Sequence, residues 1–221
     1  PDYYDLATAM ARWFPDKIIP AGTYPWGTIP DGYIGIAFIG EAPSASLWVE
    51  KVLTYAGSGA ASWILAGMQH VLTLRKTTSI HIDVVSMSLG LPQPWSAVND
   101  GTDPWSRMVD LLVRNGITVA QSTGNQGPGA FTISQSAVAK KNIGVGGYVY
   151  ARMFKMYLDW YYGYPGSSLA HMGDDDEMVW YFASRGPTRD YRTGVAVVAP
   201  CAFTIGGAGY ADLYWGSGTS F

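Results

Sequence analysis

The end of the chain carries the residues best suited to nucleophilic chemistry. Gly218-Thr219-Ser220 follows a glycine-rich turn, which can expose a serine hydroxyl at the start of a helix. A serine attacks a carbonyl when a base takes its proton and when hydrogen-bond donors stabilise the oxyanion that develops. Asn125 offers a side-chain amide as one such donor, and the backbone N–H of Ser220 offers another. The alternative for Asn125 is an asparagine that tolerates a left-handed turn.

A second set of residues predicts a surface for an extended peptide. Ser86-Met87-Ser88-Leu89-Gly90 closes an apolar stretch, and an unpaired strand edge there can pair main chain to main chain with a substrate. An ordinary core strand is the alternative, and both interpretations can be true together. Gly124 and Gly127 leave room for a side-chain pocket beside Asn125.

The hydrophobic pattern predicts the elements that position these residues. Apolar residues at three- and four-residue spacing indicate a helix capped by Ser62, while Asp103-Pro104 and Gly116 mark the start and end of another. The remaining expected elements are strands at 17–21, 46–53, 82–89, 117–120, 142–149 and 195–198, and a short early helix at 4–13. Residues 157–178 have the composition of a Tyr- and Gly-rich insertion.

The order strand, helix, strand, helix, strand over residues 46–122 predicts an α/β fold. Right-handed crossovers turn this order into a mostly parallel sheet with helices on both faces. No repeat or linker interrupts the sequence, so a single domain over residues 1–221 is expected. Sites in open sheets gather at the carboxyl ends of the strands. We therefore expect Gly90, Asn125 and the turn before Ser220 to lie together.

Composition narrows the classes of partner. The 221 residues are 48% apolar and 14% charged, and a net charge of −3 with scattered basic residues argues against nucleic acid and membrane surfaces. No apolar stretch is long enough to span a membrane. Cys201, the only cysteine, excludes an internal disulfide, and its position after Pro200 predicts a packed, inert thiol. A neutral or peptide-like partner is expected.

Several motifs in one order identify a family. The chain resembles the subtilisin-like serine proteases, the subtilases, over about residues 46–221, and most of all their pyrolysin and tripeptidyl-peptidase II branch. The matching segments are Asp83-Val84-Val85-Ser86-Met87-Ser88-Leu89-Gly90, Gly116-Ile117-Thr118-Val119-Ala120, Gly124-Asn125-Gln126-Gly127-Pro128-Gly129, Ile143-Gly144-Val145-Gly146-Gly147-Tyr148, Ser184-Arg185-Gly186-Pro187-Thr188, Val198-Ala199-Pro200 and Gly218-Thr219-Ser220.

The resemblance implies a function and a site. It makes Ser220 the nucleophile and Asn125 the oxyanion donor, and it makes Ser86 to Gly90 and Ser122-Thr123-Gly124 the walls that align substrate. It implies a three-layer sandwich that hydrolyses polypeptides without a required cofactor or catalytic metal, outside the cell or at its surface.

Two departures from the family pattern are evident. The Asp-Thr/Ser-Gly and His-Gly-Thr motifs are missing, and His70, His81 and His171 stand in other settings, so surface or packing roles are expected for them. Only Phe221 remains of the helix that begins at the serine. We therefore expect residues 1–221 to be a partial catalytic domain, with the aspartate and histidine segments before residue 1 and the helix after Ser220 missing. Other parts of its chain or further subunits would complete it, because a serine without a base is a poor nucleophile.

Other interpretations remain open. A relative that has lost activity would serve as a structural or peptide-binding subunit. Gly144-Val145-Gly146-Gly147 is the one feature of a dinucleotide-binding protein, but it lacks the third glycine at the right spacing and a following helix. Asp174-Asp175-Asp176-Glu177 can hold a structural calcium ion through carboxylate oxygens, and a solvated acidic loop is the favoured alternative.

Overall fold

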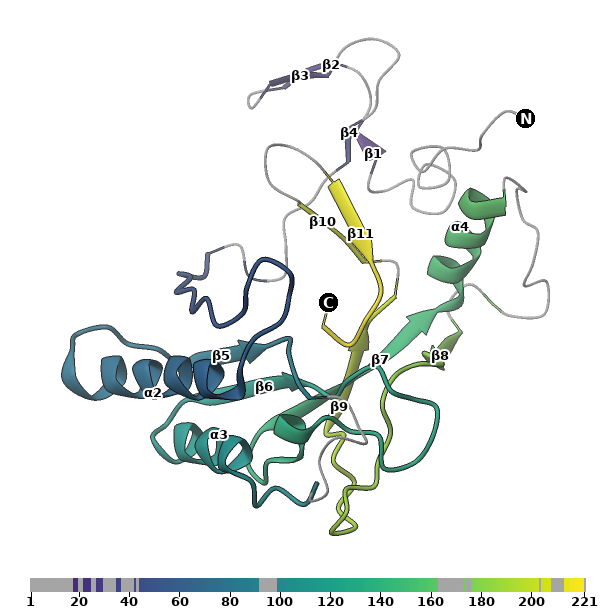
Figure 1. Cartoon of the computed structure of the whole chain (residues 1–221). Helices are drawn as coiled ribbons and strands as arrows, with labels where there is room; N and C mark the ends of the chain where they lie inside the picture. The colour runs from purple at the N-terminus through teal and green to yellow at the C-terminus, as the bar shows by residue number, and fades with distance from the viewer. Residues whose placement is uncertain are drawn as a thin grey trace. The chain divides into compact units, whose positions relative to one another are not determined.

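The computed structural model describes residues 18–19, 22–24, 27–29, 35–36, 42, 44–91, 99–162, 173, 176–202, 204–207 and 213–220 (Figure 1). The chain divides into two compact units. The first consists of Pro1–Ser46, Val149–Met178 and Phe203–Gly216, and the second of Leu47–Tyr148, Val179–Ala202 and Ser217–Phe221. A single domain over residues 1–221 stays a prediction.

The second unit is built on a parallel sheet. Its strands are β5 (Val84–Met87), β6 (Thr118–Ser122), β9 (Val197–Pro200) and all but the last two residues of β7 (Ile143–Tyr150). β6 pairs in parallel with β5 and β7, and β7 pairs in parallel with β9. A short strand, β8 (Glu177–Val179), also pairs with β7. These strands confirm the ones expected at 82–89, 117–120, 142–149 and 195–198, and the α/β fold with a mostly parallel sheet.

Two helices cover one face of this sheet. In α3 (Pro104–Arg114), the Asp103 carboxylate accepts hydrogen bonds from the backbone N–H groups of Trp105 and Ser106 at 2.9 and 3.0 Å, as its sequence predicts. Gly116, at φ 79°, follows the end of this helix. In contrast, α2 (Ala61–Thr77) begins without a side-chain cap, so Ser62 lies inside the helix rather than capping it.

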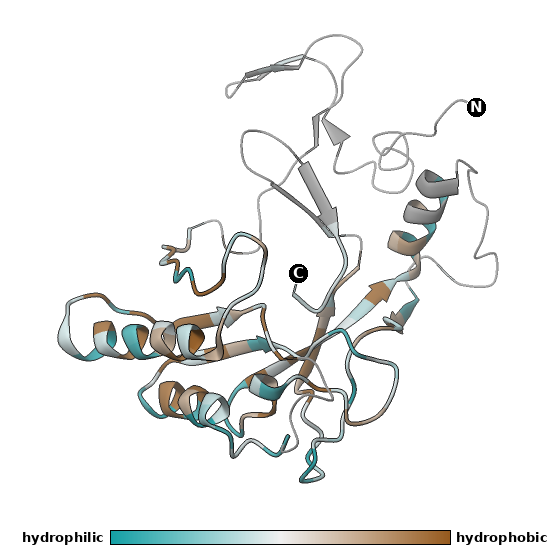
Figure 2. Cartoon of the chain, in the orientation of Figure 1, coloured by the Kyte–Doolittle hydropathy of each residue, from teal (hydrophilic) through white to brown (hydrophobic). Residues whose placement is uncertain are grey.

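The main core lies between these helices and the sheet. Met68 and Leu72 of α2, Val109 and Leu112 of α3 and Val119 of β6 are buried in one cluster. Figure 2 shows brown, apolar residues on both helices and along β9. Burying this surface from water is the main favourable contribution to folding in this unit.

The opposite face of the same sheet presents apolar side chains to solvent among the described residues. The register places Val84 beside Thr118, and alternation along the strands points their side chains away from buried Val119. Val84 is 60% exposed and Val197 is 51% exposed.

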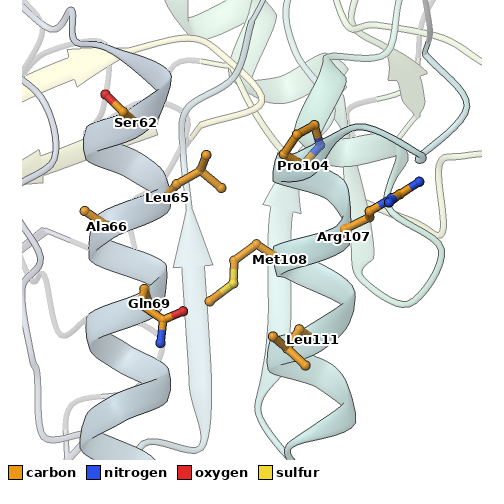
Figure 3. Close-up of a pocket in the computed structure, with 8 residues that line it drawn as sticks. All are labelled: Ser62, Leu65, Ala66, Gln69, Pro104, Arg107, Met108 and Leu111. Carbon is orange, nitrogen blue, oxygen red and sulfur yellow. The ribbon is translucent and has the colours of Figure 1, made fainter.

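The outer side of the helix pair is hollowed. A groove of about 500 Å³ lies between α2 and α3 (Figure 3). Leu65, Met108 and Leu111 contribute its apolar lining. The groove contains none of the residues predicted to form the site.

The described residues of the first unit form three antiparallel strand pairs and one helix. The pairs are β1 (Ile18–Ile19) with β4 (Gly35–Ile36), β2 (Gly22–Tyr24) with β3 (Gly27–Ile29), and β10 (Thr204–Gly207) with β11 (Leu213–Gly216). The helix is α4 (Ala151–Tyr162), which extends into the stretch expected to be an insertion. Asp159 of this helix is fully buried.

The strand expected at 46–53 does not form. Residues 45–52 have no regular structure, and Leu47 and Val49 are 87% and 82% exposed. The prediction was wrong because alternating apolar residues become a strand only where a neighbouring strand pairs with them. Val52 packs instead on α2, where a Cβ placed on Gly67 would lie 2.5 Å from its Cγ1.

Several expectations fall outside the described residues: the early helix at 4–13, His171, Phe221 and the carboxylates of Asp174 and Asp175. In the part of the chain that the structure describes, three or more metal-ligating side chains nowhere come together. The described helices include none that is long and apolar enough to cross a membrane.

Candidate active site

The structure brings Ser220 and Asn125 together. They are joined by Thr219, whose backbone N–H and hydroxyl both donate to Asn125 Oδ1, at 2.9 and 3.1 Å. The Thr219 hydroxyl in turn accepts a hydrogen bond from the backbone N–H of Gly124 at 3.1 Å. Gly218 donates its N–H to the carbonyl of Cys201 at 2.7 Å. The terminal turn is therefore tied to the segments that follow β6 and β9.

These hydrogen bonds fix which end of the Asn125 amide faces outward. A backbone N–H can only donate, so the atom beside the Thr219 N–H must be the amide oxygen. The NH₂ group is then the end available to a ligand, and Asn125 is solvent-exposed. The left-handed residue of this turn is Gly124, at φ 105°, while Asn125 does not have a positive φ. The turn therefore gives no support to the alternative interpretation of Asn125.

Ser220 is exposed and contacts the segment after β5. The Ser88 hydroxyl donates to the Ser220 carbonyl at 2.8 Å, and the Ser220 hydroxyl lies 3.4 Å from the Ser88 carbonyl. The second contact is long for a hydroxyl donor, so it holds the Ser220 hydroxyl weakly. Three chain segments, after β5, after β6 and at the end of the chain, thus meet at the carboxyl edge of the sheet.

The described histidines bond elsewhere. His70 Nδ1 lies 2.7 Å from Glu50 Oε1, and His81 Nδ1 lies 2.8 Å from Asp83 Oδ1. Their side chains are 50% and 69% exposed, in agreement with the surface roles that the sequence predicts. Neither of them is hydrogen-bonded to Ser220 in the described structure.

In the predicted wall from Ser86 to Gly90, some residues are exposed and others belong to the packed core. β5 is an end strand of the described sheet, and Ser86 is exposed. Met87 is only 6% exposed, so it belongs to the packed core rather than to an open wall. The Leu89 carbonyl accepts from Gln121 Nε2 at 2.6 Å. At Gly90, a Cβ would approach Ser134 Cβ at 2.8 Å.

The second predicted wall, Ser122-Thr123-Gly124, is held in place by hydrogen bonds from Ser134. The side chains of Ser122 and Thr123 are buried. The Thr123 carbonyl accepts from both the N–H and the hydroxyl of Ser134, at 2.8 and 2.9 Å. Gly124 is required here because its φ is 105° and because a Cβ would overlap the Ser134 hydroxyl.

Three residues that matter to this arrangement were not identified as site residues from the sequence. Thr219 and Ser184 stand inside motifs that were recognised, Gly-Thr-Ser and Ser-Arg-Gly-Pro-Thr. Ser134 stands outside the recognised motifs. Thr219 and Ser184 bond to residues 94 and 58 positions away, and Ser134 bonds to Thr123, 11 positions away. Local sequence pattern does not contain this signal.

Cys201 is a buried residue whose carbonyl is hydrogen-bonded to the terminal turn at Gly218. It is 1% exposed, and burial raises the pKa of its thiol to about 11. Its sulfur packs against Gly147, where a Cβ would overlap it. The burial confirms the prediction of a packed thiol. The raised pKa agrees with an inert thiol, because such a group carries almost no thiolate near neutral pH.

Known proteins share large parts of this sequence. The profile of the subtilase family, peptidase family S8, matches residues 21–221. Subtilisin E of Bacillus subtilis (strain 168) is 38% identical over 105 residues, which are 48% of this chain and 24% of that protein. Serine protease AprX of the same strain is 32% identical over 162 residues, covering 73% of this chain and 32% of AprX.

Solved structures show the same fold. "S41 Psychrophilic Protease" superposes with a TM-score of 0.59 at 23% identity, over 86% of this chain and 53% of that one. "Sphericase" gives the same TM-score and coverage at 21% identity. The chain spans 24% and 32% of these two curated relatives and about half of the solved structures. From the family match across most of its length, the chain belongs to the subtilase family of serine peptidases.

Proposed function

We propose that the protein hydrolyses peptide bonds through an acyl-enzyme formed on Ser220. The observation that carries this proposal is the Asn125 amide, which Thr219 fixes beside Ser220 with its NH₂ end outward. Families with this chemistry need a donor aimed at the oxyanion before the reaction starts, because a preorganised donor costs no rearrangement in the transition state.

The proposed steps follow from the groups present. Ser220 Oγ attacks the carbonyl carbon of the scissile bond and passes its proton to a base that the described residues do not supply. The Asn125 NH₂ and the Ser220 N–H stabilise the oxyanion of the tetrahedral intermediate. Collapse of that intermediate expels the amine, which takes up the proton, and water then releases the acyl group by the same route.

Substrate would lie along the edge of β5. This edge is free of a neighbouring strand in the described sheet, and Ser86 on it is exposed. An extended polypeptide can add to such an edge through main-chain hydrogen bonds. The walls at Ser88 to Gly90 and at Ser122 to Gly124 would then flank the side chain that precedes the cleaved bond.

Finer expectations rest on the sequence and the family resemblance alone. These are the pyrolysin and tripeptidyl-peptidase II branch, a location outside the cell or at its surface, a structural calcium ion without a required cofactor, and completion of the site by other parts of the chain or further subunits. The described residues themselves give no site for calcium.

A second candidate is an inactive relative that binds peptides. It is favoured by the surroundings of the Ser220 hydroxyl, whose hydrogen-bond partner among the described residues is the Ser88 carbonyl rather than a base. In that case the β5 edge would bind a peptide without cleaving it.

A fluorophosphonate probe separates these candidates, because it reacts with activated serines and spares ordinary ones. The protein made from its complete gene is treated with the probe and examined by intact mass and peptide mapping. One adduct on Ser220, lost in Ser220→Ala and kept in the surface control Ser58→Ala, is the expected result. Folded protein without an adduct would overturn the peptidase proposal and favour the peptide-binding candidate.

A further inference from the structure

The backbone of the turn around Asn125 is not held in one conformation by its own residues alone. It is exposed, and glycines at 124 and 127 flank it in a turn where Gly124 has a φ of 105°. Glycine backbones have more conformational freedom than those of other residues. The Thr219 contacts orient the end of the Asn125 side chain and hold the Gly124 N–H, but they do not reach the two peptide groups on either side of Asn125.

A second segment supplies that constraint. Ser184 is 3% exposed and makes a hydrogen bond on each side of Asn125. Its backbone N–H donates to the Gly124 carbonyl at 2.8 Å, and its hydroxyl accepts from the Gln126 N–H at 3.0 Å. The two peptide groups that flank Asn125 are therefore held by the same buried residue.

Close packing around Ser184 reinforces this constraint. The Gly127 N–H donates to the Phe182 carbonyl at 2.7 Å, so the chain from 182 to 184 runs along the turn. A Cβ on Gly124 would lie 3.0 Å from the Ser184 hydroxyl, and one on Gly127 would overlap the Ala183 carbonyl. A serine hydroxyl fits this space and reaches the Gln126 N–H, whereas a methyl group fits it without a hydrogen bond.

We propose that Ser184 is a positioning residue, which sets the place of the Asn125 amide through the backbone on either side of it. The inference rests on the proposed function, since it assigns Ser184 a part in oxyanion stabilisation by Asn125. Small displacements of a preorganised donor lower turnover strongly, with about 1 Å able to cost about a hundredfold. Loss of one hydrogen bond leaves the Ser184 backbone contact intact, so we expect a smaller effect of about tenfold.

The test is a double-mutant cycle in the protein made from its complete gene, with fluorescein-labelled casein as substrate. Ser184→Ala should lower kcat about tenfold and change KM by less than about twofold, because ground-state binding does not use the oxyanion donor. Ser184→Thr keeps the hydroxyl but adds a methyl group to a closely packed site, so it should recover part of the activity. In an Asn125→Ala background, Ser184→Ala should change kcat by less than about twofold, because no amide remains to be misplaced.

Ser106→Ala is the matched control. Ser106 is also a fully buried serine, and its hydroxyl donates to Asp103 and to the Gln135 carbonyl, at the start of α3 and apart from the site residues. It should lower stability and leave kcat unchanged. Equal losses from Ser184→Ala in both Asn125 backgrounds, or no loss in either, would overturn the positioning role.

Failure of the proposed function can be distinguished from failure of the Ser184 proposal. If the wild-type protein neither cleaves casein nor takes up a fluorophosphonate, the peptidase proposal fails and a role for Ser184 in catalysis fails with it. Amide hydrogen exchange tests the contact itself: the Gln126 amide should be protected in the wild type and exchange about tenfold faster in Ser184→Ala. Rapid exchange in the wild type would overturn the proposal whatever the activity.

Discussion

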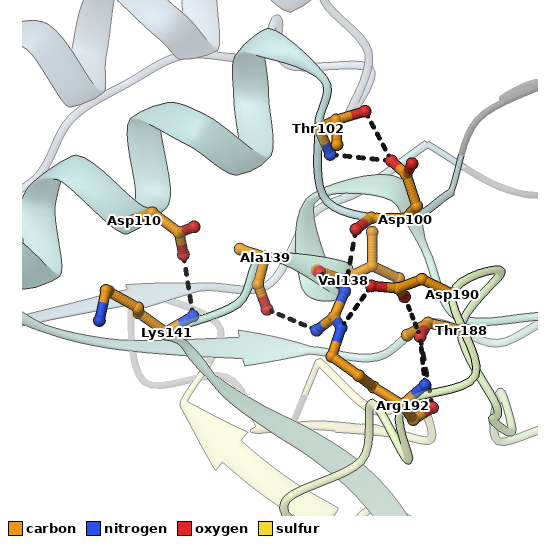
Figure 4. Close-up of polar contacts among 9 residues, drawn as sticks. All are labelled: Asp100, Thr102, Asp110, Val138, Ala139, Lys141, Thr188, Asp190 and Arg192. Atoms are coloured by element: carbon orange, nitrogen blue, oxygen red, sulfur yellow. Dashed lines mark hydrogen bonds and ion pairs between the residues drawn. The ribbon is translucent and has the colours of Figure 1, made fainter.

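Arg192 offers a stringent test of what holds the second unit together. Its guanidinium donates to three backbone carbonyls, those of Asp100 at 3.1 Å, Val138 at 2.8 Å and Ala139 at 3.4 Å (Figure 4). Its Nε also donates to Asp190 Oδ2 at 2.8 Å. One side chain therefore joins the loop before α3, the end of the short helix η2 (Gln135–Val138) and the turn at 188–192.

Replacing Arg192 by methionine keeps the apolar stem and removes all these donors. Hydrogen bonds from a charged group are worth about 1.5–3 kcal/mol each, but the side chain is 33% exposed and the bond to Ala139 is long, so water recovers part of the loss. We expect a loss of about 2–3 kcal/mol in the free energy of unfolding. With a urea slope near 2–3 kcal/mol/M, the midpoint should fall by about 1 M.

Urea unfolding followed by tryptophan fluorescence measures this effect. Arg107→Met, on the exposed side of α3, is the control and should shift the midpoint by less than about 0.3 M. Arg192→Lys should fall between the two, because an ammonium group is a point donor and cannot span three carbonyls as a planar guanidinium does. Equal midpoints for Arg192→Met and Arg107→Met would refute the argument.

Three further predictions concern the pH dependence caused by Asp190, the reactivity of the Cys201 thiol and the packing of Gly147 against Cys201 and Thr219. The hydrogen bond from Arg192 lowers the pKa of Asp190, so this carboxylate contributes stability that is present above its unfolded pKa of about 3.9 and is lost as pH falls through the lower folded value. The urea midpoint should therefore drop as the pH falls below about 4, and Asp190→Asn should remove that part of the drop. Cys201 should resist a disulfide exchange reagent at pH 8 in the folded protein and react fully in urea, because burial raises the pKa of its thiol to about 11; fast reaction of the folded protein would contradict this. Gly147→Ala would push a Cβ into the Cys201 sulfur and to within 3.3 Å of Thr219 Cγ2, so a loss of about 1–3 kcal/mol and slower labelling of Ser220 are expected. Cys201→Ala in the same chain should restore part of both, and a Gly147→Ala protein that unfolds like the wild type would show that the packing is looser than described.

The elements that the sequence predicts well are those whose signals are local. Asp103, Pro104 and Gly116 delimit α3 because capping depends on residues within one turn. The strands β5, β6, β7 and β9 follow from short apolar stretches that the core must bury. The helix α4 was not expected, since aromatic residues in that stretch favour strands and loops as readily as helices.

The sequence by itself determined the type of fold, the family and the pairing of a serine with an asparagine as candidate site residues. Tertiary structure alone decided how these residues are held. Thr219 and Asn125 are 94 positions apart, Ser184 and Gln126 are 58 apart, and Arg192 and Asp100 are 92 apart. Such hydrogen bonds have no local pattern, because each depends on where the sheet places two distant segments. For the same reason residues 46–53 remained irregular, since a strand needs a partner that only the folded chain can provide.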